Sequence, residues 1–195
     1  MGFFLIVVLL IAALVFYVIA IYNKLVMKRN QGKNSFAQIS VQLQRRHDLI
    51  PQLIEVASRY LTHEQATLTE VTQARSGAVA ANQQAAKDPN PSNLNLLERA
   101  EGMLSNALGR LMAVSEQYPD LKADALMQDL MEEMTTTENR IGFARQAYND
   151  SILDYNNARE IFPNNLLLGF FTFKPLPELR FDLESAQAPA IMSRA

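Results

Sequence analysis

An uncharged apolar run near the start of the chain, residues 3–22 (FFLIVVLLIAALVFYVIAIY), constrains the fold more than any other feature. In a helix, about 20 apolar residues are long enough to cross the roughly 30 Å hydrocarbon core of a bilayer. The alternative is a cleaved signal peptide, which has a basic start and a shorter run of about 7 to 15 apolar residues. The start of this chain, Met1 and Gly2, is not basic. We therefore expect an uncleaved transmembrane anchor over residues 1–23.

Basic residues follow this run, and none precedes it. The positive-inside rule then predicts an N-terminus outside and a large C-terminal domain in the cytoplasm. The first 47 residues carry a charge of +6 and the rest carry −8, which together give the −2 of the whole chain. The acidic remainder disfavours nucleic acid as a partner. The juxtamembrane segment 24–33 is expected to contact anionic lipid headgroups through four basic residues, Lys24, Lys28, Arg29 and Lys33.

Residues 34–162 show the spacing of amphipathic helices, with apolar positions three, four and seven residues apart. Turn residues interrupt this pattern at 87–93 (KDPNPSN) and at 117–124 (QYPDLKAD). Pro51 lies inside the first periodic segment, and an interior proline bends a helix more often than it ends one. We expect an all-α fold in which the transmembrane helix is followed by an antiparallel bundle of three long helices, the first kinked at Pro51.

The end of the chain, residues 163–195, is less regular. Its apolar core from Leu166 to Phe173 is too short to span a bilayer, so it is expected to dock on protein or lie at the membrane interface. The tail after Ser185 is small and polar and is expected to be loose.

Several blocks of this sequence together resemble the LemA family of bacterial membrane-anchored helical proteins. The resemblance implies a single-span protein of the bacterial inner membrane with a cytoplasmic helical domain and no established enzymatic activity. It also implies an alternative role, as a cofactor or chaperone-like partner of a membrane-embedded zinc protease. The matching blocks are YNKLVMKRN (22–30), QLQRRHDLIPQLIE (42–55), His63-Glu64, Ala74-Arg75, ENRIGFARQAYNDSILDYN (138–156) and Phe162-Pro163.

Motifs that would indicate catalysis or a cofactor are incomplete. The chain has no cysteine, which excludes disulfides, thiolate nucleophiles and cysteine-bound metals. His63 and Glu64 begin like the zinc motif H-E-x-x-H, but Thr67 stands where the second histidine should be. No glycine-rich phosphate loop is present. We therefore expect no enzymatic activity, no metal and no cofactor.

A dense group of polar residues lies along the last predicted helix. Amide, phenol and guanidinium groups without a nucleophile suit an interhelical hydrogen-bond network that sets the register of the bundle. Counting residues from the two turns also places Arg75 opposite Glu138. The proposed register network is Arg75, Glu138, Asn139, Arg140, Arg145, Tyr148, Asn149, Asp150, Tyr155 and Asn156.

The lower half of the first predicted helix has an apolar stripe that the short second helix could not reach. Either the chain folds back at Pro51 to give a four-helix bundle, or the stripe packs against neighbouring copies, and we favour neighbouring copies. The segment 166–173 is expected to make a second contact, far from the bilayer. The expected subunit contacts are Phe36, Ile39, Leu43, Arg45, Arg46, His47, Asp48, Ile50, Leu166, Leu167, Phe170 and Phe171.

These observations predict a non-enzymatic, membrane-anchored scaffold that forms homo-oligomers on the cytoplasmic face of the inner membrane. The alternatives are the protease cofactor and a helical-bundle sensor. A sensor is disfavoured because signalling bundles usually relay between two spans, and one span is predicted here.

Overall fold

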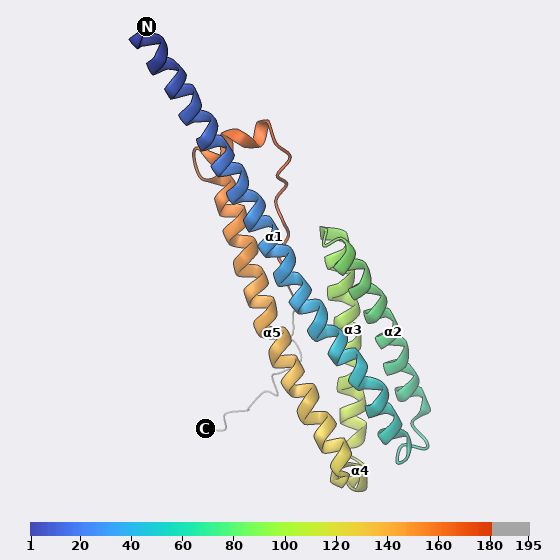
Figure 1. The fold of residues 1–195 in the computed structure, drawn as a ribbon. Helices are drawn as coiled ribbons and strands as arrows, with labels where there is room; N and C mark the ends of the chain where they lie inside the picture. The colour runs from blue at the N-terminus through green and yellow to red at the C-terminus, as the bar shows by residue number, and fades with distance from the viewer. Residues whose placement is uncertain (181–195) are drawn as a thin grey trace, which may run out of the picture.

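One helix, α1 (Gly2–Ser58), runs from the apolar N-terminal run into the bundle without a break. The computed structural model describes residues 1–180. The N-terminal part of α1 projects beyond the other helices (Figure 1), and only 6% of its most apolar window is buried inside the fold. Among the described residues, α1 alone is long and apolar enough to cross a membrane. The apolar run and the first helix of the bundle are therefore one continuous helix.

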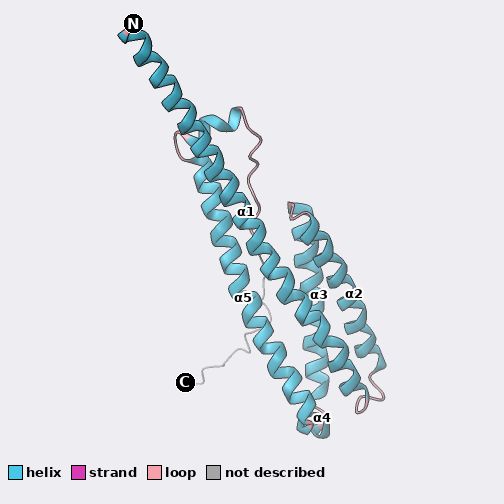
Figure 2. Cartoon of the chain, viewed as in Figure 1, coloured by secondary structure: helices cyan, strands magenta, loops and turns pink. Residues whose placement is uncertain are grey.

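Four helical segments make up the bundle, and successive segments run in opposite directions (Figure 1). The C-terminal half of α1 packs against both α5 and α2, and α2 packs against α3. Residues 1–180 contain no strand (Figure 2), so the predicted all-α fold is confirmed. The partners of α1 are α2 (Gln65–Lys87), α3 (Pro91–Ser115) and α5 (Ala125–Glu160), with the short α4 (Pro119–Ala123) before α5.

The predicted single helix over residues 34–87 is wrong, because the chain reverses at residues 59–64. The N–H groups of Tyr60 and Leu61 bond to the last turn of α1, and Leu61 is buried under the reversal. The Tyr60 hydroxyl donates to Asp124 Oδ2 at 2.8 Å and ties the turn to the start of α5. The turn contains no Gly or Pro, and Leu61 continues the apolar spacing. Periodicity therefore does not reveal it.

Pro51 does not reverse the chain. It lies within α1, on an exposed side of the helix, and α1 continues to Ser58. The bundle therefore has four helices, as in the fold-back alternative, but the reversal occurs after residue 58.

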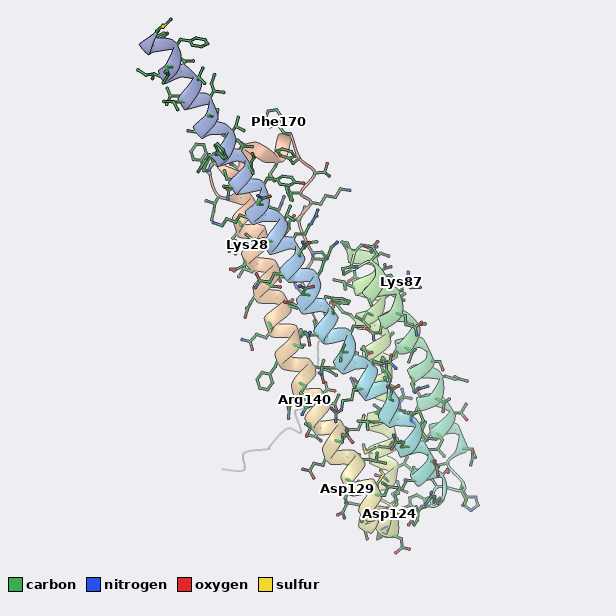
Figure 3. All side chains as sticks on the ribbon, viewed as in Figure 1. Lys28, Lys87, Asp124, Asp129, Arg140 and Phe170 are labelled. Atoms are coloured by element: carbon green, nitrogen blue, oxygen red, sulfur yellow. The ribbon has the colours of Figure 1, made fainter. Side chains whose placement is uncertain are left out.

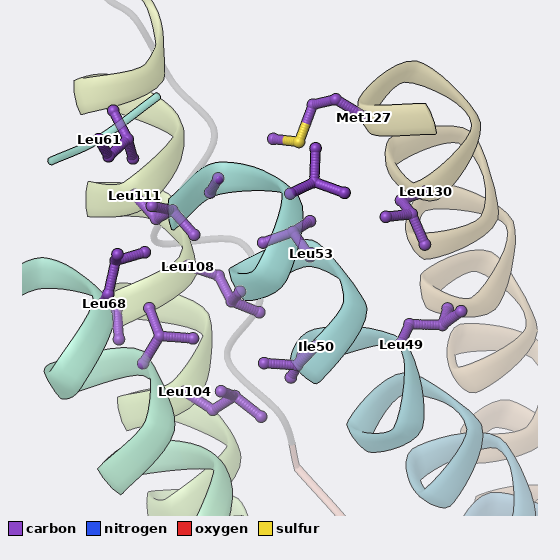
Figure 4. Close-up of a cluster of buried hydrophobic side chains, with 14 of the residues drawn as sticks. Leu49, Ile50, Leu53, Leu61, Leu68, Leu104, Leu108, Leu111, Met127 and Leu130 are labelled. Carbon is purple, nitrogen blue, oxygen red and sulfur yellow. The ribbon is translucent and has the colours of Figure 1, made fainter. Parts of the chain in front are cut away.

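The apolar stripe on α1 is covered by the chain itself. Because α2 returns along α1 after the reversal and α3 and α5 pack on the same core, Phe36, Ile39, Leu43 and Ile50 are each at most 2% exposed. Figure 4 shows Ile50 and Leu53 of α1 among leucines from the other helices. Burial of one such side chain contributes roughly 1.5 to 3 kcal/mol. The inference that the stripe has no partner within its own chain is therefore wrong.

Toward the anchor, α1 and α5 approach each other closely at Gly32. A Cβ atom at this position would lie 2.9 Å from Cδ1 of Ile152 and 3.6 Å from Cδ1 of Leu176. The absence of a side chain at residue 32 therefore permits the close packing of the two helices.

After α5 the chain forms a short 3-10 helix, η1 (Asn164–Gly169), and then an extended segment that returns along the bundle (Figure 1). The ring of Phe171 lies 5.0 Å from that of Tyr22, at the end of the apolar run. The expectation that residues 166–173 lie far from the bilayer is therefore wrong, because α5 runs back toward the anchor. The predicted loose tail after Ser185 lies outside the described residues.

Candidate functional site

The centre of the bundle contains a buried polar cluster built around Arg46 of α1. Its Nη1 lies 3.4 Å from Glu101 Oε2 of α3 and 3.2 Å from Glu138 Oε2 of α5. Its Nη2 donates to the hydroxyl of Ser105 at 2.9 Å. The neighbouring His47 places Nε2 2.7 Å from Glu101 Oε1. The cluster therefore links three helices at one level of the bundle.

Most of this polar cluster is closed to solvent, and Glu138 lies at its edge with its side chain 36% exposed. The side chain of Arg46 is 7% exposed, that of Glu101 is 2% exposed and that of His47 is fully buried. Arg46, His47 and Glu101 each bind another member of the cluster, while Arg46 Nε and His47 Nδ1 are buried without a hydrogen-bond partner among the described residues. Their burial leaves a substrate no open path to these atoms. Among residues 1–180, no group of three or more His, Asp or Glu side chains could hold a metal ion. The arrangement suits structural pairing of buried charges.

The remaining helix of the bundle, α2, contacts the backbone of α1 at the same level as the polar cluster. Arg75 of α2 donates its Nε–H to the carbonyl oxygen of His47 at 2.6 Å. In a helix this carbonyl would accept from the N–H four residues later, but that residue is Pro51, which has none. Arg75 therefore supplies the hydrogen bond that Pro51 removes.

A second polar arrangement joins α5 to the extended C-terminal segment, which we call the strap (residues 173–180). Asn156 binds the backbone of Leu176 twice, donating to its carbonyl at 2.9 Å and accepting from its N–H at 3.1 Å. Asn149 binds Leu179 in the same way, at 3.0 and 2.9 Å. Each asparagine thus satisfies both backbone groups of one strap residue.

A tyrosine precedes each of these asparagines and also binds the strap. The hydroxyl of Tyr148 donates to the carbonyl of Pro177 at 2.8 Å, and that of Tyr155 donates to the carbonyl of Lys174 at 3.0 Å. Burial raises the pKa of Tyr148 to about 12 and also raises the pKa of Tyr155. Both hydroxyls therefore remain protonated donors at neutral pH.

The spacing of these bonds explains why the strap fits α5. The contacts recur every seven residues on α5 and every three residues on the strap. Seven helical residues rise about 10.5 Å, and three residues of extended chain span about 10 Å. Pro175 and Pro177 favour the extended conformation and bring no N–H that would need a partner.

A cleft of about 540 Å³ lies between α1, the turn joining α2 to α3, and the strap. Part of its wall is apolar, from Phe36, Tyr148 and the two strap prolines. Its charged lining residues are Lys33, Lys87, Asp88 and Lys174.

The structure places the predicted register network in three different settings. Arg75 and Glu138 contact the adjacent α1 residues 47 and 46, so both lie beside one turn of α1. The four tyrosine and asparagine residues bind the strap rather than another helix, so the expectation of an interhelical network is wrong for them. Asn139, Arg140 and Asp150 are exposed on α5, and Arg145 is partly buried there.

The residues predicted to contact other subunits also differ in their settings. Six of them are buried within their own chain and are unavailable to a neighbouring copy. Arg45 pairs with Glu133 of α5, and Asp48 accepts from Gln44 at 2.8 Å. Leu166, Phe170 and Phe171 are exposed. The side chain of Leu167 lies outside the described residues, and the contact of all four with another subunit stays a prediction. The six buried residues are Phe36, Ile39, Leu43, Arg46, His47 and Ile50.

The basic juxtamembrane residues lie at the anchor end of the bundle, where Figure 3 shows Lys28 near Phe170 and far from Asp124. Lys28 pairs with Asp154 of α5 at 3.0 Å. The guanidinium of Arg29 lies 5.8 Å from the ring centroid of Phe173. Lys24 and Lys33 are exposed, and contact of these residues with lipid headgroups stays a prediction.

Sequence reasoning missed Glu101 and the strap residues. Glu101 interrupts the apolar stripe of α3 between Leu97 and Leu104, and a carboxylate on a buried face indicates a buried partner. The sequence also indicates the strap. The pair Tyr-Asn recurs seven residues apart on α5, and two prolines separated by one residue follow it in the chain.

These features define a membrane-associated helical protein: a long apolar helix continuous with a four-helix bundle that is closed around a polar centre. A sequence model of the LemA family matches residues 35–192, which is most of the chain. The chain therefore belongs to the LemA family, and the family expected from the sequence is confirmed.

Similar proteins occur in two bacterial species. The magnetosome protein MamQ of Magnetospirillum gryphiswaldense is 27% identical, over 78% of this chain and 62% of that protein. The magnetosome proteins MamQ 2 and MamQ 1 of Paramagnetospirillum magneticum match with the same identity and coverage. The chain thus spans 62% of the length of these relatives.

Proposed function

We propose that this protein is a non-enzymatic scaffold that is anchored in the bacterial inner membrane and self-assembles on its cytoplasmic face. The observation that carries the proposal is the continuity of α1 from the apolar run into the bundle core. A continuous helix joins the bundle directly to the apolar run, with no linker between them. Any protein bound to the bundle is then held close to the bilayer.

The buried chemistry supports a role without turnover. Arg46, His47 and Glu101 of the charged centre are buried and bind one another, and Glu138 pairs with Arg46 at the edge. Two tyrosine–asparagine pairs of α5, at 148–149 and 155–156, are occupied by the strap. The relatives are named for the magnetosome and not for a reaction.

Self-assembly would use the outer faces of the bundle, since the stripe on α1 is internal. Large apolar side chains are exposed there, including Met103 on α3 and Phe143 on α5. Isolated exposed apolar residues are common, so their role in assembly must be tested directly.

The test is the mass of the full-length protein in detergent, measured by light scattering after size-exclusion chromatography. We expect a particle of several copies. The double variant Met103→Asp, Phe143→Asp should give a smaller particle with an unchanged helical circular-dichroism signal, because it places charges in the proposed contacts. The control, Ala66→Asp with Gln73→Asp, adds the same charge at exposed positions of α2 and should leave the mass unchanged. A monomeric wild type would contradict self-assembly.

The cleft beside the strap favours a second candidate, a cofactor or chaperone-like partner of a membrane-embedded protease. Its apolar walls and three lysines could receive a segment of another protein. Purification of the intact protein from native membranes, followed by identification of its companions, separates the two candidates. Recovery of a protease in fixed proportion, without self-association, would favour the cofactor.

A further inference from the structure

The segment that connects α5 to the strap lies beside the end of the apolar run of α1. The ring centroid of Tyr22, the last residue of that run, is 5.0 Å from that of Phe171 and 5.4 Å from that of Phe173. Figure 3 shows Phe170 at the same end of the bundle, close to the projecting helix. Two segments about 150 residues apart in sequence therefore meet where α1 would leave the bilayer.

This connecting segment is unusually apolar for an exposed surface. Residues 161–173 (IFPNNLLLGFFTF) contain no charged residue. Four large apolar side chains in it are more than half exposed: Ile161 at 59%, Phe162 at 73%, Leu166 at 60% and Phe170 at 84%. Within the bundle itself, exposed aromatic residues of this kind are isolated, as Phe143 is.

The charges around this segment fit an anionic surface. Lys24 is exposed two residues after Tyr22, and the neighbouring acid Asp154 is paired with Lys28 at 3.0 Å. Glu160 is the one exposed acid adjoining the segment in sequence. Aromatic rings at the level of lipid headgroups, beside Lys and Arg, are the usual arrangement at a membrane interface.

We propose that residues 161–171 form a second membrane contact, in which the exposed apolar side chains enter the headgroup region of the phospholipid bilayer beside α1. The end of α5 then rests on the membrane that α1 crosses. Two points of attachment restrict the tilt and rotation of the bundle, which a single helix alone would not do. The proposal requires that the apolar run lie in a bilayer, but it does not require self-assembly.

The chain contains no tryptophan, so a single introduced tryptophan reports its own surroundings. Full-length Phe170→Trp would be reconstituted at one copy per nanodisc, with phosphatidylcholine and phosphatidylglycerol carrying brominated acyl chains. The matched control is Phe143→Trp, at an aromatic position of α5 that is 73% exposed. We expect blue-shifted emission and quenching at residue 170 that is several-fold stronger than at residue 143.

Equal, water-like emission at the two positions would overturn the proposal. A blue shift at residue 170 without quenching by brominated lipid would also overturn it, since it would indicate a protein environment. Because each nanodisc holds one copy, failure of this test leaves the scaffold proposal standing, and the mass measurement tests that separately.

A second measurement avoids any change to an aromatic residue. The chain has no cysteine, and a Cβ atom would meet nothing within 4 Å at either Gly169 or Gly102. Spin labels on Gly169→Cys and Gly102→Cys can therefore be compared for collision with oxygen, which concentrates in the bilayer, and with a water-soluble nickel complex. We expect the label at residue 169 to be oxygen-accessible and shielded from nickel, and the label at residue 102 to show the reverse. Nickel access at both sites would contradict membrane contact.

Discussion

Arg75 of α2 binds the carbonyl oxygen of His47 at 2.6 Å, and this is the carbonyl that Pro51 deprives of its helical donor. The proline in the middle of α1 and the arginine on the neighbouring helix thus form one structural device. It allows a proline inside a buried helix without an unsatisfied carbonyl, and it ties α2 to α1 at the level of the charged centre.

The first prediction tests this relationship by a double-mutant cycle. Arg75→Ala leaves a buried carbonyl without a donor and should lower the free energy of unfolding by about 1 to 3 kcal/mol. In a Pro51→Ala background the backbone N–H of residue 51 can bind the same carbonyl, so the cost of Arg75→Ala should be clearly smaller. Urea unfolding followed by circular dichroism measures both costs. Equal costs in the two backgrounds would show that the two residues are not coupled.

The second prediction concerns the buried charge at Glu101. Glu101→Leu leaves Arg46 with the partly exposed Glu138 as its remaining carboxylate partner and removes the partner of His47 Nε2, so it should destabilise the fold by about 3 to 5 kcal/mol. Combining it with Arg46→Met should recover part of the loss, because the cationic side chain is removed as well. The measurement is again urea unfolding. A double variant less stable than Glu101→Leu alone would argue against charge pairing as the reason for burial.

The third prediction separates folding from assembly. Leu43 is 1% exposed and Ile50 is fully buried in the chain's own core, so Leu43→Asp or Ile50→Asp buries an unpaired charge. Either variant should lose more than about 4 kcal/mol of stability. Circular dichroism should show loss of cooperative helical unfolding. If either variant were instead a stable helical monomer, Leu43 and Ile50 would have to lie in a subunit interface.

The fourth prediction addresses the strap through hydrogen exchange at single amides. The N–H of Leu176 is bound by Asn156, and that of Leu179 is bound by Asn149. Asn156→Ala should speed exchange more at Leu176 than at Leu179, and Asn149→Ala should do the opposite. Each variant acts as the control for the other. Uniform change at both amides would mean that the strap leaves α5 as one unit.

The fifth prediction is a loss of stability at alkaline pH. An unperturbed tyrosine has a pKa near 10, whereas burial raises the pKa of Tyr148 to about 12. The unfolded chain therefore releases this proton first, so the stabilisation is complete below about pH 10 and falls as the pH rises toward about 12. The two pKa units correspond to about 2.7 kcal/mol. Unfolding of Tyr148→Phe should depend less on pH over this interval than that of the wild type.

Much of the architecture was predictable from local patterns. Length and hydropathy alone indicate the apolar span, and the apolar spacing indicates helices. The turn between α2 and α3 and the break before α5 were also predictable, since proline and polar turn residues mark them. These features depend on residues that are neighbours in sequence, so the sequence carries them directly.

The partners of each helix face depended on the tertiary structure. The reversal at residues 59–64 has no glycine or proline, and its stability comes from Leu61 in the core and from Tyr60 bound to Asp124. Missing this turn left the α1 stripe apparently uncovered and placed the segment 166–173 at the wrong end of the bundle.

The candidate site was predicted in part. The polar residues of α5 were identified, but their partners were not, since a helical period shows which side chains share a face and not what covers that face. The bonds from Arg46 to Glu101 and from Asn149 to Leu179 join residues 55 and 30 positions apart. The sequence by itself determined the helical class and an apolar segment long enough to cross a membrane, because local spacing and hydropathy suffice for these. Only the tertiary structure decided which buried charges pair and where the strap lies, because those contacts form when distant parts of the chain pack together.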